Sequence, residues 1–282
     1  MTPGPAFWRA APLLVVTFVH RMASIALSLL PALLVDREAS IAAAAVAMGV
    51  VKSAGIVGNL ASGVVADRFG LRVTLVCSLG LAGLGVLGML VPRSVELLCV
   101  GAAIAQIGTG MVPGATRLML AAMVPLEEQR AALAWQRSTA NLGLVVSFSL
   151  GAALGGHVPV LLALDAAASF GAAAFAARLP GGAPVAATPK AGSASTVIPF
   201  VWMTVILGGY NLVYEAYFTA TAAQLRAALG PAGVSWYSAV MVLNVVGCAA
   251  LGVLAARWID EPRWSIPGGL VLLLVGAGVG VA

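Results

Sequence analysis

Ionisable and hydroxyl side chains recur at helical spacing inside apolar stretches of this 282-residue sequence. In residues 10–35, one helix face carries four such side chains at 4-3-4 spacing, with His20 beside them: Thr17, Arg21, Ser24 and Ser28. In residues 39–65, a second face combines a cation with small and polar residues: Lys52, Gly55, Asn59 and Ser62. Arg21 and Lys52 together would form a cationic patch suited to an anionic group of a ligand.

A third face, in residues 198–222, is aromatic and acidic. Its members are Tyr210, Tyr214, Tyr217 and Thr221 at 4-3-4 spacing, with Asn211 and Glu215 adjacent. Aromatic rings beside a carboxylate suit an amphipathic or cationic ligand. Because a carboxyl in an apolar cavity can take up and release a proton, Glu215 is the first candidate for a proton carrier. The alternative is a glutamate near the helix end that reaches water.

Each of these charges also has a structural explanation. Arg21 and Lys52 could extend to the membrane interface, or pair with Asp165 or Glu215. A histidine beside an arginine, as His20 is, often serves as a hydrogen-bonded packing residue. Asp165, inside the apolar stretch 158–177, is a cavity candidate whose simpler role is a structural pair.

Motifs of soluble enzymes and metal sites do not occur in this sequence. Gly83, Gly85 and Gly88 match GxGxxG, but they lie inside an apolar run with no strand before it, which favours helix packing over dinucleotide binding. The three cysteines show no CxxC spacing. We therefore expect no enzyme, no cofactor, no metal site and no ATP-driven mechanism within this chain.

The composition places these faces in a lipid bilayer. Hydrophobic residues make up 61% of the chain and charged residues 9%, whereas average globular domains are about 45–50% apolar and about 25% charged. A soluble enzyme, a disordered chain and a disulfide scaffold are excluded together.

Nine apolar runs are long enough to cross a membrane as helices, which requires about 20 residues each. Their approximate limits are 10–35, 39–65, 73–91, 97–123, 138–156, 158–177, 198–222, 234–256 and 266–282. The runs lack the period-two alternation of a membrane β-barrel. Gly143, Ser147, Gly151 and Gly155 predict a close-packed seam. Trp236, Tyr237, Trp258 and Trp264 lie near the run ends and suit the membrane interface.

The distribution of basic residues predicts the orientation. Ten of the 15 Lys and Arg residues fall on the side of the N-terminus and three on the other side. By the positive-inside rule, the N-terminus is cytoplasmic, in an inner cell membrane. The net charge of +5 then reflects topology, and no nucleic-acid partner is expected.

Residues 179–196, LPGGAPVAATPKAGSAST, are rich in Pro, Gly, Ala, Ser and Thr and predict a flexible linker. The predicted domains are a six-helix bundle at 1–178, a cytoplasmic linker at 179–197 and a partial bundle of three helices at 198–282. Residues 63–69, GVVADRF, and residues 252–258, GVLAARW, match at four of seven positions and lie six runs apart. Such a repeat is typical of two related halves.

Residues 63–72 read Gly-Val-Val-Ala-Asp-Arg-Phe-Gly-Leu-Arg, which resembles the G-x-x-x-D-R-x-G-R-R/K signature of the major facilitator superfamily. The basic tail is shifted by one residue, and Val73 stands where a second basic residue is common. The segment is predicted to be the loop between the second and third spans, where glycine at Gly63 and Gly70 permits close helix approach and a tight turn. Residues 124–130 with Asn141, Gly143 and Gly155-Gly156 are similar to that family's fourth loop and fifth span. Residues 164–170, LDAAASF, look like its sixth span, particularly in small-molecule exporters.

The resemblance implies an all-α, polytopic membrane protein that transports a small molecule by alternating access. It further implies that the first motif stabilises one face of the cycle, through Gly63, Asp67, Arg68, Gly70 and Arg72. Export of an amphipathic or drug-like compound, with protons as the coupling ion, is the leading hypothesis. The alternatives are uptake of an anionic metabolite, or a membrane partner or fragment without transport activity.

Three departures qualify the resemblance. Ile104 occupies the position of the fourth-span arginine, and Ala152 replaces the proline of the antiporter motif, so an antiporter is only slightly favoured. Family members have twelve spans, whereas nine are found here and the sequence stops within an apolar run. We therefore expect a chain that is incomplete at its C-terminus.

Overall fold

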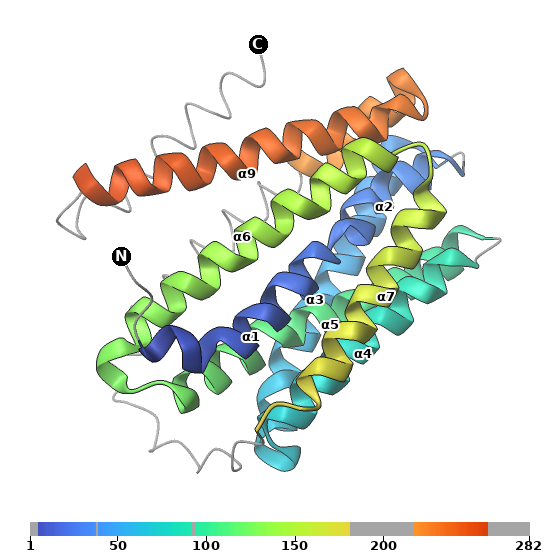
Figure 1. The fold of residues 1–282 in the computed structure, drawn as a ribbon. Coiled ribbons are helices and arrows are strands. Elements are labelled where there is room, and N and C mark those ends of the chain that lie inside the picture. The colour runs from blue at the N-terminus through green and yellow to red at the C-terminus, as the bar shows by residue number, and fades with distance from the viewer. Residues whose placement is uncertain (1–4, 38, 92–93, 181–216, 259–282) are drawn as a thin grey trace, which may run out of the picture. The chain divides into compact units, whose positions relative to one another are not determined.

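The computed structural model describes residues 5–37, 39–91, 94–180 and 217–258 (Figure 1). All regular structure in these ranges is helical, which confirms the predicted all-α fold. The predicted linker beyond residue 180, the ninth apolar run and most of the seventh lie outside the described residues.

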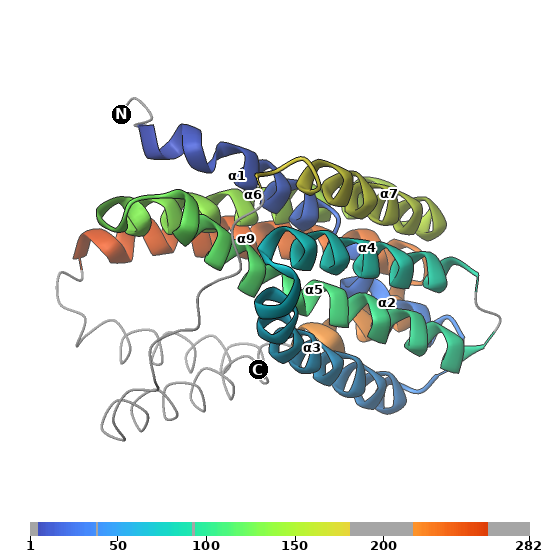
Figure 2. The same ribbon diagram turned by 90° about the horizontal axis from the view of Figure 1, so that it is seen from below.

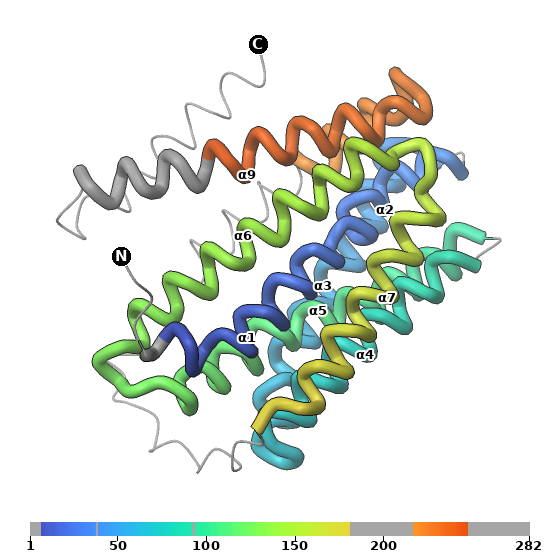
Figure 3. The backbone as a smooth tube through the Cα atoms, viewed as in Figure 1, coloured from blue at the N-terminus to red at the C-terminus, as the bar shows by residue number. Residues whose placement is uncertain are grey.

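Most ends of the described helices fall within five residues of the predicted runs, but one helix begins at Gln129 and not near 138, and one ends at 229 and not near 222. The described helices are α1 (Pro5–Met22), α2 (Ile25–Val35), α3 (Ile41–Phe69), α4 (Leu71–Leu90), α5 (Val95–Met123), the short 3-10 helix η1 (Leu126–Glu128), α6 (Gln129–Leu154), α7 (Val158–Ala176), a helix at residues 217–229 and α9 (Ala232–Trp258). The first run differs from the expected single helix, because it is divided into α1 and α2, which follow one another along one line (Figure 3).

Five segments among the described helices are long and apolar enough to cross a membrane. They are Phe7–Val35, which joins α1 and α2, together with α3, α4, α5 and α7. The chain is therefore a polytopic membrane protein. By its contacts the chain divides into two compact units, Met1–Val242 and Leu243–Ala282. The first unit holds every described helix up to the first part of α9, and the described part of the second is the rest of α9.

Within the first unit, α5 packs chiefly against α4 and α3, while α7 covers α4 and α1 packs against α6 and α7. Figures 1 and 2 show α1 lying along α6. Glycine permits the closest of these approaches. A Cβ atom at Gly85 of α4 would overlap the amide nitrogen of Ala105 of α5, and one at Gly58 of α3 would overlap the carbonyl oxygen of Ile107. The GxGxxG stretch is thus a packing surface, as expected.

Two apolar clusters occupy opposite ends of the same helices. One contains residues of α1, the end of α5 and the end of α7, such as Leu13, Met119 and Ala176. The other contains residues of α2, the start of α5 and the start of α7, such as Leu30, Leu98 and Leu162. The division of the first span into α1 and α2 falls between the two clusters.

A single residue, Gly70, connects α3 to α4. Its φ of 83° lies in the left-handed region, which only glycine adopts without strain. The amide of Gly70 donates to the carbonyl of Ala66 at 2.9 Å and so closes the end of α3. The segment predicted as a loop is therefore mostly helix, and the turn is Gly70 alone.

Replacing Gly85 with alanine should destabilise the protein, because the added methyl group must push α4 away from α5. We expect the free energy of unfolding to fall by about 1–3 kcal/mol. Gly80→Ala is the matched control in the same helix, since no described atom lies within 4 Å of the position of its Cβ. Thermal unfolding of the two purified variants in detergent measures the difference. Equal midpoints would contradict the assignment of Gly85 to the packing surface.

Candidate functional site

The first membrane span is interrupted at Ala23 and Ser24. Ser24 precedes α2 with φ −112° and ψ 11°, and its side chain does not cap the helix. The Oδ2 atom of Asp165, on α7, instead accepts a hydrogen bond of 2.9 Å from the amide of Ala26. Asp165 is only 3% exposed. It therefore supplies from another helix the acceptor that an N-cap residue normally provides. Of the two roles suggested for Asp165, in the cavity or in the structure, its contacts support the structural one.

The hydroxyl groups near the interruption bond to their own helix. Thr17 donates to the carbonyl of Leu13 and Ser24 to the carbonyl of His20, each at 3.0 Å. His20 is 3% exposed, and its Nδ1 atom has no hydrogen-bond partner among the described residues. Of the three hydroxyl residues on the predicted face of the first span, Ser28 lines the cavity described below.

Arg21 lies at the C-terminal end of α1, packed against α6. A Cβ atom at Gly143 would lie 2.8 Å from the Cβ of Arg21. Among the described residues, no carboxylate lies within ion-pair distance of Arg21. The alternative of an Arg21–Asp165 pair is thereby removed.

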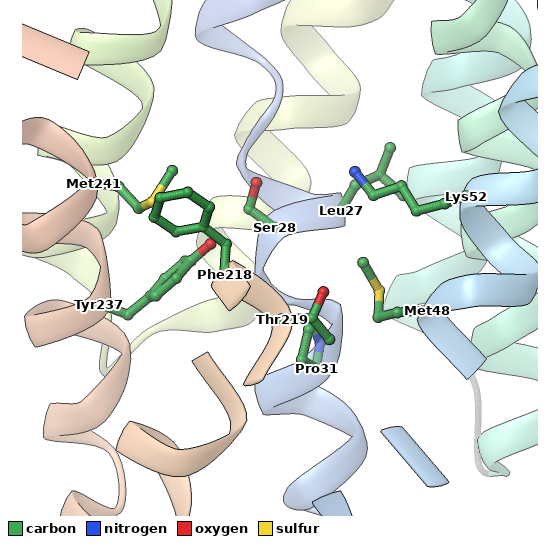
Figure 4. Close-up of a pocket in the computed structure, with 9 residues that line it drawn as sticks. All are labelled: Leu27, Ser28, Pro31, Met48, Lys52, Phe218, Thr219, Tyr237 and Met241. Atoms are coloured by element: carbon green, nitrogen blue, oxygen red, sulfur yellow. The ribbon is translucent and has the colours of Figure 1, made fainter. Parts of the chain in front are cut away.

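A small cavity of about 70 Å³ lies where α2 and α3 meet the helix at residues 217–229 and α9 (Figure 4). Figure 4 shows Lys52 on one side and Tyr237 and Met241 on the other. The lining residues are Leu27, Ser28, Pro31, Met48, Lys52, Phe218, Thr219, Tyr237 and Met241. Three hydroxyls and one ammonium group thus face an otherwise apolar lining. Tyr237 is 4% exposed, so its ring packs among the helices and is not presented to lipid.

An ion pair joins two of the elements that line this cavity. The Nε atom of Arg226, in the helix at residues 217–229, contacts Oδ1 of Asp36, and its second nitrogen donates to Oδ2 at 2.7 Å. This bidentate geometry is the strong form of an arginine–carboxylate pair. Asp36 follows the end of α2, whereas Ser28 and Pro31 of the same helix line the cavity. The pair therefore lies beyond one end of the cavity.

Sequence reasoning missed this ion pair. Arg226 entered only the count of basic residues, and Asp36 was not singled out. The signal that could have found them is the occurrence of opposite charges at the ends of the first and seventh apolar runs, on the same side of the membrane.

The residues of the segment 63–72 are placed as follows. Gly63, Asp67, Arg68 and Arg72 are exposed, and Gly70 is buried in the turn. Arg72 donates to the carbonyl of Leu179, just after α7, at 3.3 Å. No described atom lies within 4 Å of where a Cβ would stand at Gly63, so the close approach expected there is not seen among the described residues.

The remaining candidates divide into two groups. Asn59 is exposed and near Gly114 of α5, outside the cavity that Lys52 lines. Tyr210, Asn211, Tyr214 and Glu215 lie outside the described residues. Tyr217, from the same predicted face, is exposed, and its carbonyl accepts a hydrogen bond of 2.9 Å from the hydroxyl of Thr221.

The small residues of α6 form the predicted seam. Besides the contact of Gly143 with α1, a Cβ at Gly151 would lie 2.5 Å from the hydroxyl of Ser238, and one at Gly155 would lie 2.5 Å from that of Ser235. Both serines belong to α9. The seam therefore packs α6 against helices of the first and the second half of the chain.

A family model described as Major Facilitator Superfamily matches residues 13–282. No curated protein matches the chain.

Removing the carboxyl group of Asp165 should destabilise the interrupted span. Asp165→Ala leaves the buried amide of Ala26 without an acceptor, which costs about 1–3 kcal/mol of unfolding free energy. Asp165→Asn keeps a carbonyl oxygen at the same place and should cost less. Thermal unfolding of both variants tests the order. If the alanine variant is as stable as the native protein, the capping role is wrong.

Proposed function

The chain belongs to the major facilitator superfamily of membrane transporters, and we propose that it exports a small amphipathic molecule in exchange for protons. The proposed setting is a bacterial cytoplasmic membrane, with the N-terminus in the cytoplasm. The chain would comprise three parts, which are a six-helix bundle at 1–178, a linker at 179–197 and a partial second bundle at 198–282.

One observation carries this proposal. The cavity is lined from both proposed bundles, by Ser28 and Lys52 of the first and by Phe218, Thr219 and Tyr237 of the second. Transporters with related halves bind substrate between those halves, near the middle of the membrane, and expose the site alternately to each side as the halves rock. An apolar lining with a few polar groups is suited to an amphipathic substrate.

The ion pair of Asp36 and Arg226 is well placed to act as the outer gate. Asp36 lies eight residues beyond Ser28, which corresponds to about 12 Å along a helix. Arg226 lies seven residues beyond Thr219 on the other side of the cavity. If the turn at Gly70 lies on the cytoplasmic side of the membrane, the pair of Asp36 and Arg226 lies on the outer side. Opening toward the outside would then separate Asp36 from Arg226.

The segment Gly63–Arg72 would act at the cytoplasmic side. Its exposed Asp67 and Arg68 are available to contact the second bundle in one state of the cycle. Glu215 is the proposed proton carrier, on the basis of its place among the tyrosines of the seventh run. A carboxyl group that is protonated from outside and deprotonated to the cytoplasm would couple proton entry to substrate exit.

The second candidate function is uptake of an anionic metabolite. The position of Lys52 in the cavity favours it. Both functions use the same site and differ in the direction of net transport.

Neutralising Glu215 should abolish proton-driven export, because Glu215→Gln can neither bind nor release the coupling proton. The measurement is efflux of an amphipathic dye from cells or proteoliposomes under an imposed pH gradient. Glu127→Gln, at an exposed position of η1, is the matched carboxyl control and should retain efflux. Unchanged efflux in Glu215→Gln would exclude Glu215 as the carrier.

Breaking the ion pair should favour opening of the outer end. We place a single cysteine at Ser28, after replacing the three native cysteines with alanine, and measure its reaction with an impermeant maleimide added outside. Arg226→Gln should raise the labelling rate about two- to fivefold, since a partly exposed pair contributes about 0.2–1 kcal/mol. Exchanging the two charges, in Asp36→Arg with Arg226→Asp, should restore the slow rate.

Arg37→Gln is the control for this experiment. Arg37 is next to Asp36 but donates to the carbonyl of Ser94, at 3.2 Å, and not to the ion pair. If Arg37→Gln and Arg226→Gln change labelling equally, a general charge effect explains the result and the gate is wrong.

A further inference from the structure

The interruption between α1 and α2 has the form of a hinge. The last backbone hydrogen bond of α1 runs from the amide of Ala23 to the carbonyl of Val19, at 3.0 Å. The amide of Ala26 does not continue this series, because it donates to Oδ2 of Asp165 on α7. Among the described residues, no backbone hydrogen bond crosses from α2 to α1. The contact with Asp165 therefore fixes the start of α2.

The direction of α2 affects both the cavity and the proposed gate. Ser28, two residues after Ala26, lines the cavity, whereas Asp36 follows the last residue of α2 and binds Arg226. Two residues of a helix correspond to about 3 Å along its axis. The hydrogen bond to Asp165 is thus less than one turn from the cavity, and a change in this bond would act on both sites through one short helix.

The carboxyl group of Asp165 has few compensating partners. It is 3% exposed, and among the described residues only the amide of Ala26 donates a hydrogen bond to it. No described basic side chain lies within ion-pair distance of it. An acid inside a membrane span that has no cationic partner is a candidate proton-binding group.

Few other titratable groups lie on the helices that surround Asp165. α7 packs against α1, α2, α4 and α6, and neither α2 nor the rest of α7 carries a titratable side chain. The remaining helices carry Arg9, His20, Arg21, Arg72, Cys77, Arg130 and Arg137. His20 and Arg21 end α1 beside the interruption. His20 is therefore the second group there that could bind a proton.

We propose that Asp165 is a second proton-binding residue of the transporter, which positions α2 as a carboxylate and releases it when protonated. A carboxylate accepts a stronger hydrogen bond than a neutral carboxyl group, and the dipole of α2 favours a negative charge at its N-terminus. A proton that enters through the cavity and binds a carboxyl oxygen weakens both interactions. α2 can then tilt at the interruption and separate Asp36 from Arg226. This inference rests on the proposed function, because it adds a second site at which protons would act.

The experiment measures opening of the outer end as a function of pH. Ser28→Cys, in a chain whose three native cysteines are replaced with alanine, is labelled in intact cells with an impermeant maleimide. Each rate is divided by that of Val91→Cys at the same pH, which cancels the pH dependence of thiol reactivity. Val91 is exposed and lies at the same end of the molecule as Asp36, because Arg37 donates to the carbonyl of Ser94.

We expect this labelling ratio to rise at least about threefold between about pH 8 and about pH 5, because protonation removes a charge-assisted hydrogen bond. A ratio that does not change, or that falls with falling pH, would overturn the proposal.

Asp165→Asn resembles the protonated form, since its amide oxygen accepts a hydrogen bond without carrying a charge. Its labelling ratio should be high at every pH, near the value that the native residue gives at low pH. If Asp165→Asn keeps the native pH dependence, or a low ratio at every pH, Asp165 is not the proton-binding group.

Three variants test the other groups that could produce the same pH dependence. His20→Gln removes the second titratable group at the interruption, Asp36→Asn the carboxylate of the gate and Glu215→Gln the proposed proton carrier. The rise in the ratio should persist in all three. Its loss in any one of them would assign the titration to that residue and overturn the role of Asp165. These variants decide the question even if Asp165→Asn does not fold.

Efflux assays separate this inference from the proposed function. A pH-dependent ratio that requires Asp165, without proton-driven efflux of the dye, would support the proton-binding role and refute the exporter. Proton-driven efflux with a ratio that does not depend on pH would support the exporter and refute the role of Asp165.

Discussion

The hydrogen bond from the amide of Ala26 to Asp165 makes the interrupted first span possible. No water is present in the hydrocarbon core to satisfy free backbone groups, so a helix that stops inside it needs partners from the protein. The carboxylate of α7 meets this need at the start of α2, between the two apolar clusters. The interruption lets α1 end in His20 and Arg21 while α2 continues to the cavity and to Asp36. The cavity and the proposed gate therefore both involve the helix that begins at this interruption.

The helices around this interruption are held together by close packing at small residues. Helices in a membrane gain no hydrophobic driving force from one another, and their association relies on contact area between small residues. The contacts of Gly85 with α5, of Gly58 with α5 and of Gly143 with α1 are of this kind. Lys52 and Ser28 are only partly buried and line the cavity.

The sequence predicted the helices well, because apolar run length is a direct consequence of membrane thickness. It also predicted the seam of α6 and the turn at Gly70, because both depend on small residues at nearby positions in the sequence. The interruption at Ser24 was missed, since its cause is Asp165, 141 residues away. The ion pair of Asp36 and Arg226 and the inward place of Tyr237 were missed because helix rotation is set by tertiary packing. Periodicity grouped Thr17, Arg21, Ser24 and Ser28, but hydrogen bonds to the helix backbone occupy two of their hydroxyls.

The one-residue turn at Gly70 also constrains how the chain enters the membrane during synthesis. A helix of 29 residues, as α3 is, extends about 43 Å, whereas one residue of connection spans less than 4 Å. The end of α3 and the start of α4 must therefore reach the same side of the bilayer together. Insertion of α3 and α4 as a single helical hairpin meets this condition, and it places Arg68 and Arg72 on that side as a joint retention signal for the positive-inside rule.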